Sequence, residues 1–155
     1  MDFRIAEEKD IPRLLDLLLQ IANLHAALRP DLFKKGERKY EEGELRSILK
    51  RPDRPIYVAV FEGNVVGYAF CEQTSSGTTR QKTLYIDDFC VDESMQNQGI
   101  GSALFAYVKA QAALNGVEAI TLHLWAGNQE AASFYKKMGL EVRYLALYCP
   151  IKGQG

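Results

Sequence analysis

The sequence predicts a mixed, mostly antiparallel α/β sheet in one domain, with helices on both faces. Strand-like apolar runs and amphipathic helical segments alternate along the chain, without repeats, low-complexity tracts or a linker. A Gly63-Asn64 turn between two apolar runs is typical of an antiparallel hairpin. The length of 155 residues suits a single core. We therefore expect one domain over residues 1–155.

The individual elements follow from apolar periodicity and from helix start and stop signals. Asp10 can cap a first helix, which ends near Leu28 because Pro30 disfavours helix at the residue before it. The other expected helices cover residues 44–50, 99–115 and 128–138. The expected strands cover residues 2–6, 56–61, 65–72, 83–91, 119–125 and 140–149, with a polar loop over 74–80. The charged stretch over 34–54 is either a solvated surface or a wall of a substrate pocket.

Composition and charge exclude several classes of partner. The formal net charge of −1 gives no general attraction to nucleic acid or to anionic membranes. No apolar run approaches the ~20 residues of a membrane span, and the acidic, mixed N-terminus does not resemble a signal peptide. The three cysteines are far apart, and Cys71 and Cys90 lie in apolar runs. We expect buried free thiols, no metal site and a cytoplasmic location.

A turn between an apolar strand and a helix carries two glycines. The strand ends at Val91, and Gly99 and Gly101 lie where the turn becomes the helix. A helix start has unpaired backbone N–H groups and a partial positive charge, and glycine lets a ligand approach that backbone. The pattern therefore predicts an anion site for a phosphate-bearing ligand.

Three phosphate-binding motifs can be compared with this turn. A Walker-type loop requires a lysine after the glycines, and none follows here. A dinucleotide fingerprint requires Gly or Ala where Leu104 stands, and an acid at the end of the next strand, whereas Glu118 lies at its start. The pattern that fits is Q-x-x-G-x-G, from Gln96 to Gly101.

The segment from Ile86 to Val91, followed by Gln96–Gly101, resembles the GNAT superfamily of acetyl-CoA-dependent N-acetyltransferases. A second segment, which begins with Asn128 and Ala131 and continues over residues 134–140, resembles the other signature of that family. Both signatures occur at the family's spacing and with its element order. The resemblance implies a GNAT-like fold and the activity of an acyltransferase that uses acetyl-CoA as co-substrate, without a metal.

The resemblance also implies which residues contact acetyl-CoA. By that resemblance Phe89, Cys90 and Val91 would line the pantetheine arm, which agrees with the ability of an exposed strand edge to pair with an amide-bearing chain. Asn128 and Ala131 would contact the cofactor as well. The residues expected at the pyrophosphate are Gln96, Asn97, Gln98, Gly99, Ile100, Gly101 and Ser102. The family often has arginine in this turn, whereas this turn has glutamine and asparagine, so backbone N–H groups would carry the binding.

Tyr135 matches the family's tyrosine beside the cofactor sulfur. When an amine attacks a thioester, a thiolate leaves. A tyrosine with a pKa near ~10 is protonated at neutral pH and can donate a proton to that sulfur.

The base has three candidates, namely Asp87, Asp88 and His123. Asp87 and Asp88 are adjacent on a strand and are expected to point to opposite faces. An ordinary aspartate with a pKa near ~3.9 is a poor base for an alkylammonium near ~10.4, because the difference corresponds to roughly 9 kcal/mol. Asp87 would then hold the cation or pass its proton through water. His123 has a suitable ordinary pKa, but it could simply face solvent.

The resulting hypothesis is direct attack of a primary amine on acetyl-CoA in a ternary complex. A small-molecule acceptor is favoured, because Asp87 and Asp88 offer a cation site. The alternatives are an acetyltransferase of protein N-termini or lysines, and a non-catalytic acyl-CoA-binding or sensing module. A homodimer is expected by resemblance to the family.

Overall fold

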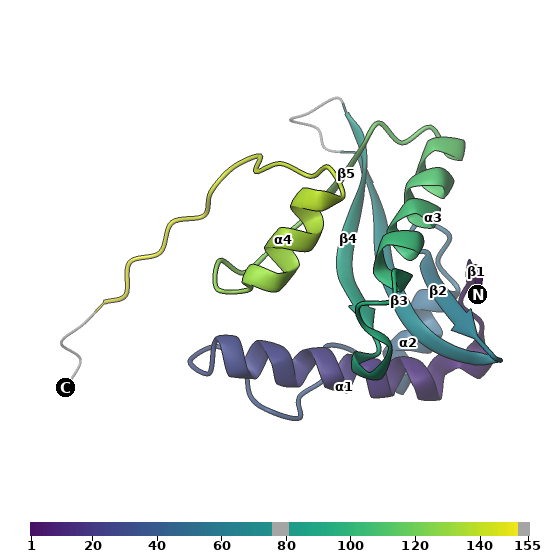
Figure 1. Cartoon of the computed structure of the whole chain (residues 1–155), viewed down its shortest axis with the longest axis horizontal. Coiled ribbons are helices and arrows are strands. Elements are labelled where there is room, and N and C mark those ends of the chain that lie inside the picture. Colours follow the sequence, from purple (N-terminus) through teal and green to yellow (C-terminus); the bar gives the residue numbers. More distant parts are fainter. Residues whose placement is uncertain (76–80, 152–155) are drawn as a thin grey trace.

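The computed structural model describes residues 1–75 and 81–151 and contains a five-stranded mixed sheet (Figure 1). The strand order is β1-β2-β3-β4-β5, antiparallel as far as β4, with β5 parallel to β4. The strands are β1 (Asp2–Ile5), β2 (Ile56–Phe61), β3 (Asn64–Ser75), β4 (Lys82–Val91) and β5 (Ala119–Leu122). The helices are α1 (Ile11–Leu28), α2 (Glu42–Leu49), α3 (Ile100–Leu114) and α4 (Gln129–Lys137), with short 3-10 turns at Glu8–Asp10 and Glu93–Met95.

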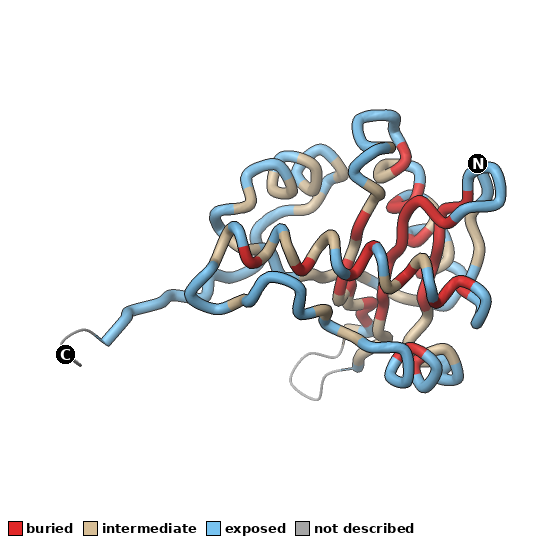
Figure 2. Tube along the Cα trace, turned by 90° about the horizontal axis from the view of Figure 1, so that it is seen from below, coloured by how far each residue is buried: buried red, intermediate tan, exposed pale blue. Residues whose placement is uncertain are grey.

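Helices cover both faces of the sheet, as the sequence predicted. One core layer joins the apolar faces of α1 and α2 to β2, β3 and the end of β4, around Leu14, Leu45 and Tyr68. The other layer joins α3 to the opposite face, around Leu104, Val108 and Ile86. Figure 2 shows the buried residues concentrated in the sheet and recurring at intervals along α1. None of the helices in the described ranges is both long and apolar enough to cross a membrane.

A β-bulge on β4 changes which side chains face each layer. Phe70 of β3 lies opposite Asp88, whereas the next residue, Cys71, lies opposite Ile86, so Asp87 is the extra residue. Before the bulge Ile86 packs in the α3 layer, and after it Cys90 packs in the α1 layer. The alternation expected for a regular strand is therefore interrupted at the two acids.

The strands β4 and β5 separate beyond the bulge. Their parallel pairing ends at Ile86 and Leu122, although β4 continues to Val91. The strand expected over 119–125 thus ends at Leu122, because β4 no longer offers a partner to the residues that follow. From Asp87 to Val91 this edge of β4 has no strand partner among the described residues, and the unpaired edge, on the side of α4, is called the gap below.

The strand expected over 140–149 is contradicted, since residues 140–151 have no regular secondary structure. The segment leaves the end of α4 and extends from the body of the molecule (Figure 1). Its apolar pattern favours a strand, but a strand needs a neighbour, and no described strand pairs with it. The loop expected over 74–80 is also shorter, because Thr74 and Ser75 belong to β3. Residues 76–80 of that loop lie outside the described ranges.

Candidate active site

The turn from β4 to α3 presents a run of free backbone donors. Within the described residues, none of the N–H groups of residues 96–102 donates a hydrogen bond to another protein group. The first intrahelical bond of α3 runs from the Ala103 N–H to the Gly99 carbonyl, at 3.1 Å. Seven consecutive donors at a helix start, next to the positive end of the helix dipole, can bind a di-anionic group.

The backbone of this turn requires two residues in the left-handed region. Asn97 has φ 63° and Gly99 has φ 81°. Asparagine and glycine are the residues that adopt this conformation most readily. Gly101 serves a different purpose, because a Cβ atom there would lie 3.3 Å from the ring of Phe134 on α4. Its lack of a side chain lets the start of α3 approach α4 closely.

The edge of β4 that faces the gap offers backbone groups from alternate residues. The Asp92 N–H donates to the Val66 carbonyl of β3 at 2.8 Å. Alternation along an antiparallel ladder then directs the N–H and C=O of Cys90 toward β3, and those of Phe89 and Val91 away from it. Phe89 and Val91 are therefore placed to pair with an extended ligand in the gap. The backbone of Cys90 is not, and its side chain is buried in the α1 layer.

The Val91 carbonyl already has partners within the chain. It accepts hydrogen bonds from the side-chain amides of Gln20, at 2.9 Å, and Gln96, at 3.2 Å. Gln20 also accepts from the Glu93 N–H, so α1 is tied to the start of the turn. The Val91 carbonyl is therefore not free for a ligand.

Asn128 and Ala131 contact each other at the start of α4. The Asn128 side chain accepts a hydrogen bond from the Ala131 N–H at 3.2 Å, which is an N-cap. Their contact with a cofactor stays a prediction. The cap fixes the start of the helix that carries Tyr135.

Tyr135 lies on α4 beside the ring of Phe89, with ring centroids 6.3 Å apart. Burial, with the charges of Asp88 and Cys90, raises the pKa of Tyr135 above its usual value. Tyr135 therefore stays protonated across the physiological pH range. It is a hydroxyl donor at the gap.

Asp88 is the buried acid of the site, with 8% of its surface exposed. Burial raises the pKa of Asp88 to about 7, and the neighbouring Asp87 adds to this effect, while the Lys39 ammonium opposes it. The hydroxyl of Tyr68, fully buried, has no hydrogen-bond partner among the described residues. Burial raises the pKa of Tyr68, and the charge of Asp88 adds to this effect. A carboxyl group with a pKa near neutrality can accept and release protons at physiological pH.

Asp87 is hydrogen-bonded to residues of the connection between α1 and α2. Its carboxylate accepts hydrogen bonds from the Lys39 ammonium, at 2.8 Å, and from the Tyr40 hydroxyl. Tyr40 in turn accepts from Arg54 at 2.9 Å. The bulge interrupts the alternation at Asp87 and Asp88, and the Lys39 ammonium that binds Asp87 also lowers the pKa of Asp88.

His123 lies just beyond β5 and is exposed. Its ring nitrogens contact two tyrosine hydroxyls, Tyr85 at 3.3 Å and Tyr144 at 3.0 Å. The structure therefore places His123 between tyrosines at the outer edge of the sheet, whereas Asp88 and Tyr135 lie where β4 separates from its neighbour.

Several residues of the site had no recognisable sequence signal. Lys39 and Tyr40 lie 48 and 47 positions from Asp87 in a stretch that resembles a solvated surface. Tyr68 is one of eight tyrosines in the chain. Its place in the site depends on the register between β3 and β4, which includes the bulge and has no signal in the sequence. Within the described part, no group of three or more His, Cys, Asp or Glu side chains could hold a metal ion.

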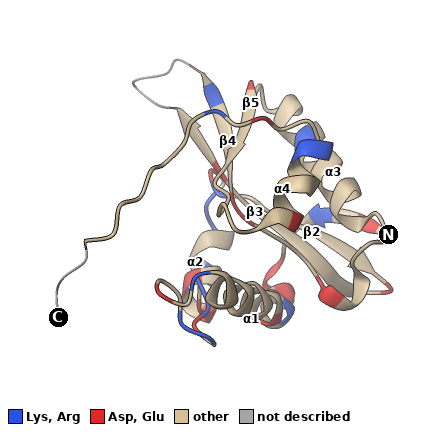
Figure 3. Ribbon diagram, turned by 60° about the vertical axis from the view of Figure 1, so that its left-hand side comes forward, with Lys and Arg blue, Asp and Glu red and all other residues tan. Residues whose placement is uncertain are grey.

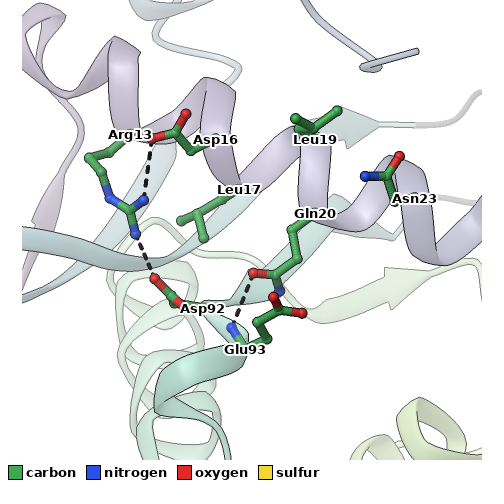
Figure 4. Close-up of a pocket in the computed structure, with 8 residues that line it drawn as sticks. All are labelled: Arg13, Asp16, Leu17, Leu19, Gln20, Asn23, Asp92 and Glu93. Atoms are coloured by element: carbon green, nitrogen blue, oxygen red, sulfur yellow. Dashed lines mark hydrogen bonds and ion pairs between the residues drawn. The ribbon is translucent and has the colours of Figure 1, made fainter. Parts of the chain in front are cut away.

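The described residues also line two surface depressions. One, of about 320 Å³, lies between α1 and the turn after β4, as Figure 4 shows. There Arg13 bridges Asp16, at 3.4 Å, and Asp92, at 2.7 Å, so its charges are largely paired and fasten α1 to the turn. The other, of about 540 Å³, is lined by residues 30–35 with Ala26 and Glu37. The second depression borders the charged stretch considered above as a pocket wall.

The chain matches known proteins over most of its length. Residues 18–140 match the model of the acetyltransferase (GNAT) family. GCN5-related N-acetyltransferase 6, chloroplastic, of Arabidopsis thaliana is 28% identical over 114 residues, which covers 70% of this chain and 39% of the relative. The uncharacterized N-acetyltransferase MJ1207 of Methanocaldococcus jannaschii is 25% identical, covering 72% of this chain and 50% of the relative. The matched region spans half or less of both relatives.

Solved structures share the fold. The tetramutant of the BH1408 protein from Bacillus halodurans superposes with a TM-score of 0.91 at 25% identity, covering 97% of this chain and 100% of that one. The aminoglycoside acetyltransferase meta-AAC0020, from an uncultured soil metagenomic sample, superposes with a TM-score of 0.74 at 22% identity, covering 97% and 96%.

Proposed function

Because the chain belongs to the GNAT acetyltransferase family, we propose that it transfers an acetyl group from acetyl-CoA to the primary amine of a small molecule. The amine attacks the thioester directly in a ternary complex. The observation that carries this proposal is the run of free N–H groups over residues 96–102, next to the separated edge of β4. The two features match the two ends of one elongated substrate, a pyrophosphate and an amide-bearing arm.

Each part of acetyl-CoA has a matching group in the chain. The N–H groups of residues 96–102 face the pyrophosphate oxygens, since no arginine is present in the turn. The backbone groups of Phe89 and Val91 pair with the pantetheine amides, as an added strand pairs with a sheet edge. The pairing at Val91 uses its N–H group, because Gln20 and Gln96 occupy its carbonyl. The thioester then lies between β4 and Tyr135.

Asp88 is the better base of the three candidates. Its pKa of about 7 leaves a difference of about 3.4 pH units from an alkylammonium near ~10.4. That difference corresponds to roughly 5 kcal/mol, against roughly 9 kcal/mol for an ordinary aspartate. Asp87 is held by Lys39, and its carboxylate fixes the α1–α2 connection beside the site. His123 is assigned no proton transfer.

An acceptor that arrives as an ammonium loses two protons from its nitrogen during the reaction. Asp88 takes one proton, and the amine nitrogen forms a bond with the carbonyl carbon of the thioester. The carbon–sulfur bond breaks as the carbonyl re-forms, and the nitrogen loses its second proton to solvent. The leaving sulfur takes the hydroxyl proton of Tyr135, which solvent replaces. Asp88 then releases its proton to solvent, so the products are the amide, the free thiol of coenzyme A and one released proton.

The acceptor class rests on the acids of the site and on the structural neighbours. Because the Asp87 carboxylate is already paired with Lys39, Asp88 is the acid left to bind a cationic acceptor when it is ionised. A fold neighbour is an aminoglycoside acetyltransferase, whose name indicates an aminoglycoside acceptor. We expect a homodimer, as the family resemblance implies.

The experiment is release of coenzyme A thiol from acetyl-CoA in the presence of amine panels, with the acetylated product identified by mass spectrometry. Polyamines and aminoglycosides form one panel, and peptides with free N-termini or lysines form the other. Turnover with the first panel supports the proposal. Turnover confined to peptides overturns the acceptor class. Binding of acetyl-CoA without turnover in either panel identifies a sensing module.

A further inference from the structure

Tyr68 is a fully buried tyrosine of β3, and the proposed proton transfers give it no role. Its exposed fraction is 0%. The hydroxyl oxygen is buried as well, and it has no hydrogen-bond partner among the described residues. A buried hydroxyl without a partner is unfavourable, and most such groups in folded proteins are hydrogen-bonded. Tyr68 is therefore a candidate for a role that supplies this hydroxyl with an acceptor.

The register of the sheet makes Tyr68 a diagonal neighbour of Asp88. Tyr68 lies opposite Cys90, and Phe70 lies opposite Asp88. The side chains of Tyr68, Phe70 and Cys90 pack in the α1 layer. Asp88 is two positions before Cys90, and the register is regular between them, so its side chain is on the same face. Diagonal neighbours on one face of an antiparallel pair are within reach of a long aromatic side chain.

The two groups differ in the form that each adopts near neutral pH. Burial, together with the charge of Asp88, raises the pKa of Tyr68 well above its usual value, so Tyr68 stays protonated and can donate. Asp88 has a pKa of about 7, chiefly because it is buried, so it is partly ionised at neutral pH. An ionised carboxylate is a stronger acceptor than a protonated acid. The Tyr68 hydroxyl therefore favours the charged form of Asp88 and opposes the effect of burial.

We propose that Tyr68 is a positioning residue for Asp88, because its buried hydroxyl donates a hydrogen bond to one oxygen of the ionised carboxylate. The other oxygen is then left to accept the proton of the ammonium acceptor. The hydrogen bond also limits the orientations of the carboxylate before the acceptor arrives. No proton moves to or from Tyr68, so the balance of the reaction is unchanged. This role rests on the proposed function, in which Asp88 is the base.

Other ionisable groups surround Asp88 as well. The Lys39 ammonium, on the connection between α1 and α2, lowers the pKa of Asp88, and the neighbouring Asp87 raises it. Figure 3 shows charged residues around α1 and α2, beside a sheet that is drawn mostly in tan. Burial raises the pKa values of three further groups on β4 and α4, and the charge of Asp88 adds to each: Tyr85, Cys90 and Tyr135. The side chains that α1 contributes to this layer include three leucines: Leu14, Leu17 and Leu18. Replacing Tyr68 by phenylalanine leaves all of these groups in place.

The test compares two tyrosine-to-phenylalanine variants of the full chain. Tyr68→Phe removes only a hydroxyl without a partner and keeps the ring, whose centroid lies 4.8 Å from that of Phe70, so the variant should fold. Tyr57→Phe is the matched control, because Tyr57 is 6% exposed on the neighbouring strand but packs in the α3 layer. NMR titration of 13C-labelled aspartate carboxyl groups measures the pKa of Asp88, and the spectrum of Asp88→Asn identifies its signal. This measurement needs neither acetyl-CoA nor an acceptor amine.

The proposal predicts a pKa of about 7 for Asp88 in the wild type and in Tyr57→Phe. In Tyr68→Phe the pKa should be higher by about one to two pH units, which is the equivalent of one hydrogen bond to a charged group. A wild-type value near 7 that is unchanged or lower in Tyr68→Phe overturns the role of Tyr68 alone. A wild-type value near the usual 3.8 removes Asp88 as the base and overturns both proposals.

Discussion

The buried carboxyl group of Asp88 should make the protein less stable as the pH rises from about 4 to about 7. Burial raises its pKa from the usual 3.8 to about 7 in the folded state. Between these values the folded chain binds more protons than the unfolded chain, so the free energy of unfolding falls with pH. At 1.36 kcal/mol per pH unit, the difference amounts to about 4 kcal/mol.

The perturbation that isolates this effect is Asp88→Asn, which keeps the shape and removes the titration. Relative to the wild type, this variant should gain about 4 kcal/mol of unfolding free energy between pH 4 and pH 8. Urea denaturation at several pH values, followed by circular dichroism, measures the difference. Asp16→Asn is the control, because its carboxyl group is 64% exposed. Parallel pH curves for the wild type and Asp88→Asn would refute the buried-acid argument.

Three further predictions concern the site. Tyr135→Phe should lower kcat at least tenfold, since the hydroxyl acts on the leaving sulfur. The Kd for acetyl-CoA, measured by calorimetry, should stay within about twofold. An unchanged kcat would remove Tyr135 from the mechanism. Gly101→Ala should cost about 1–3 kcal/mol of stability and weaken acetyl-CoA binding, because its methyl group would meet Phe134 at 3.3 Å. Gly127→Ala, with open space at that position, is its control, and equal effects in the two variants would contradict the packing argument. Lys39→Met should raise the pKa of Asp88, because it removes the cation that opposes the effect of burial. The rise of kcat/KM with pH should then move to higher pH, and a move to lower pH would refute this role of Lys39.

The fold was largely predictable because its signals are local. Helix caps, the hairpin turn at Gly63 and the glycines of the β4–α3 turn depend on neighbouring residues, and the helices and central strands appear within a few residues of the expected positions. The strand over 140–149 was wrong for the opposite reason. Its alternation is a local property, but a strand forms only where another chain segment supplies hydrogen bonds.

The arrangement of the acids was less predictable. The sequence identified Asp87 and Asp88 but gave no indication of the bulge between them, which depends on the register of β3. Asp88 is buried, and its pKa is affected by Tyr68 and Lys39, which are distant from it in sequence. Likewise Lys39 and Tyr40 reach Asp87 only through the tertiary fold. A ranking of candidate bases therefore required the three-dimensional environment, because burial sets the pKa.

The dependence of kcat/KM on pH tests the central claim most directly, once an acceptor amine has been found. If Asp88 accepts the proton, kcat/KM for the wild type should rise with pH and level off with an apparent pKa near 7. In Asp88→Asn that step should disappear, and turnover should fall at least a hundredfold while acetyl-CoA still binds. A variant that keeps both the step and the turnover would show that another group serves as the base.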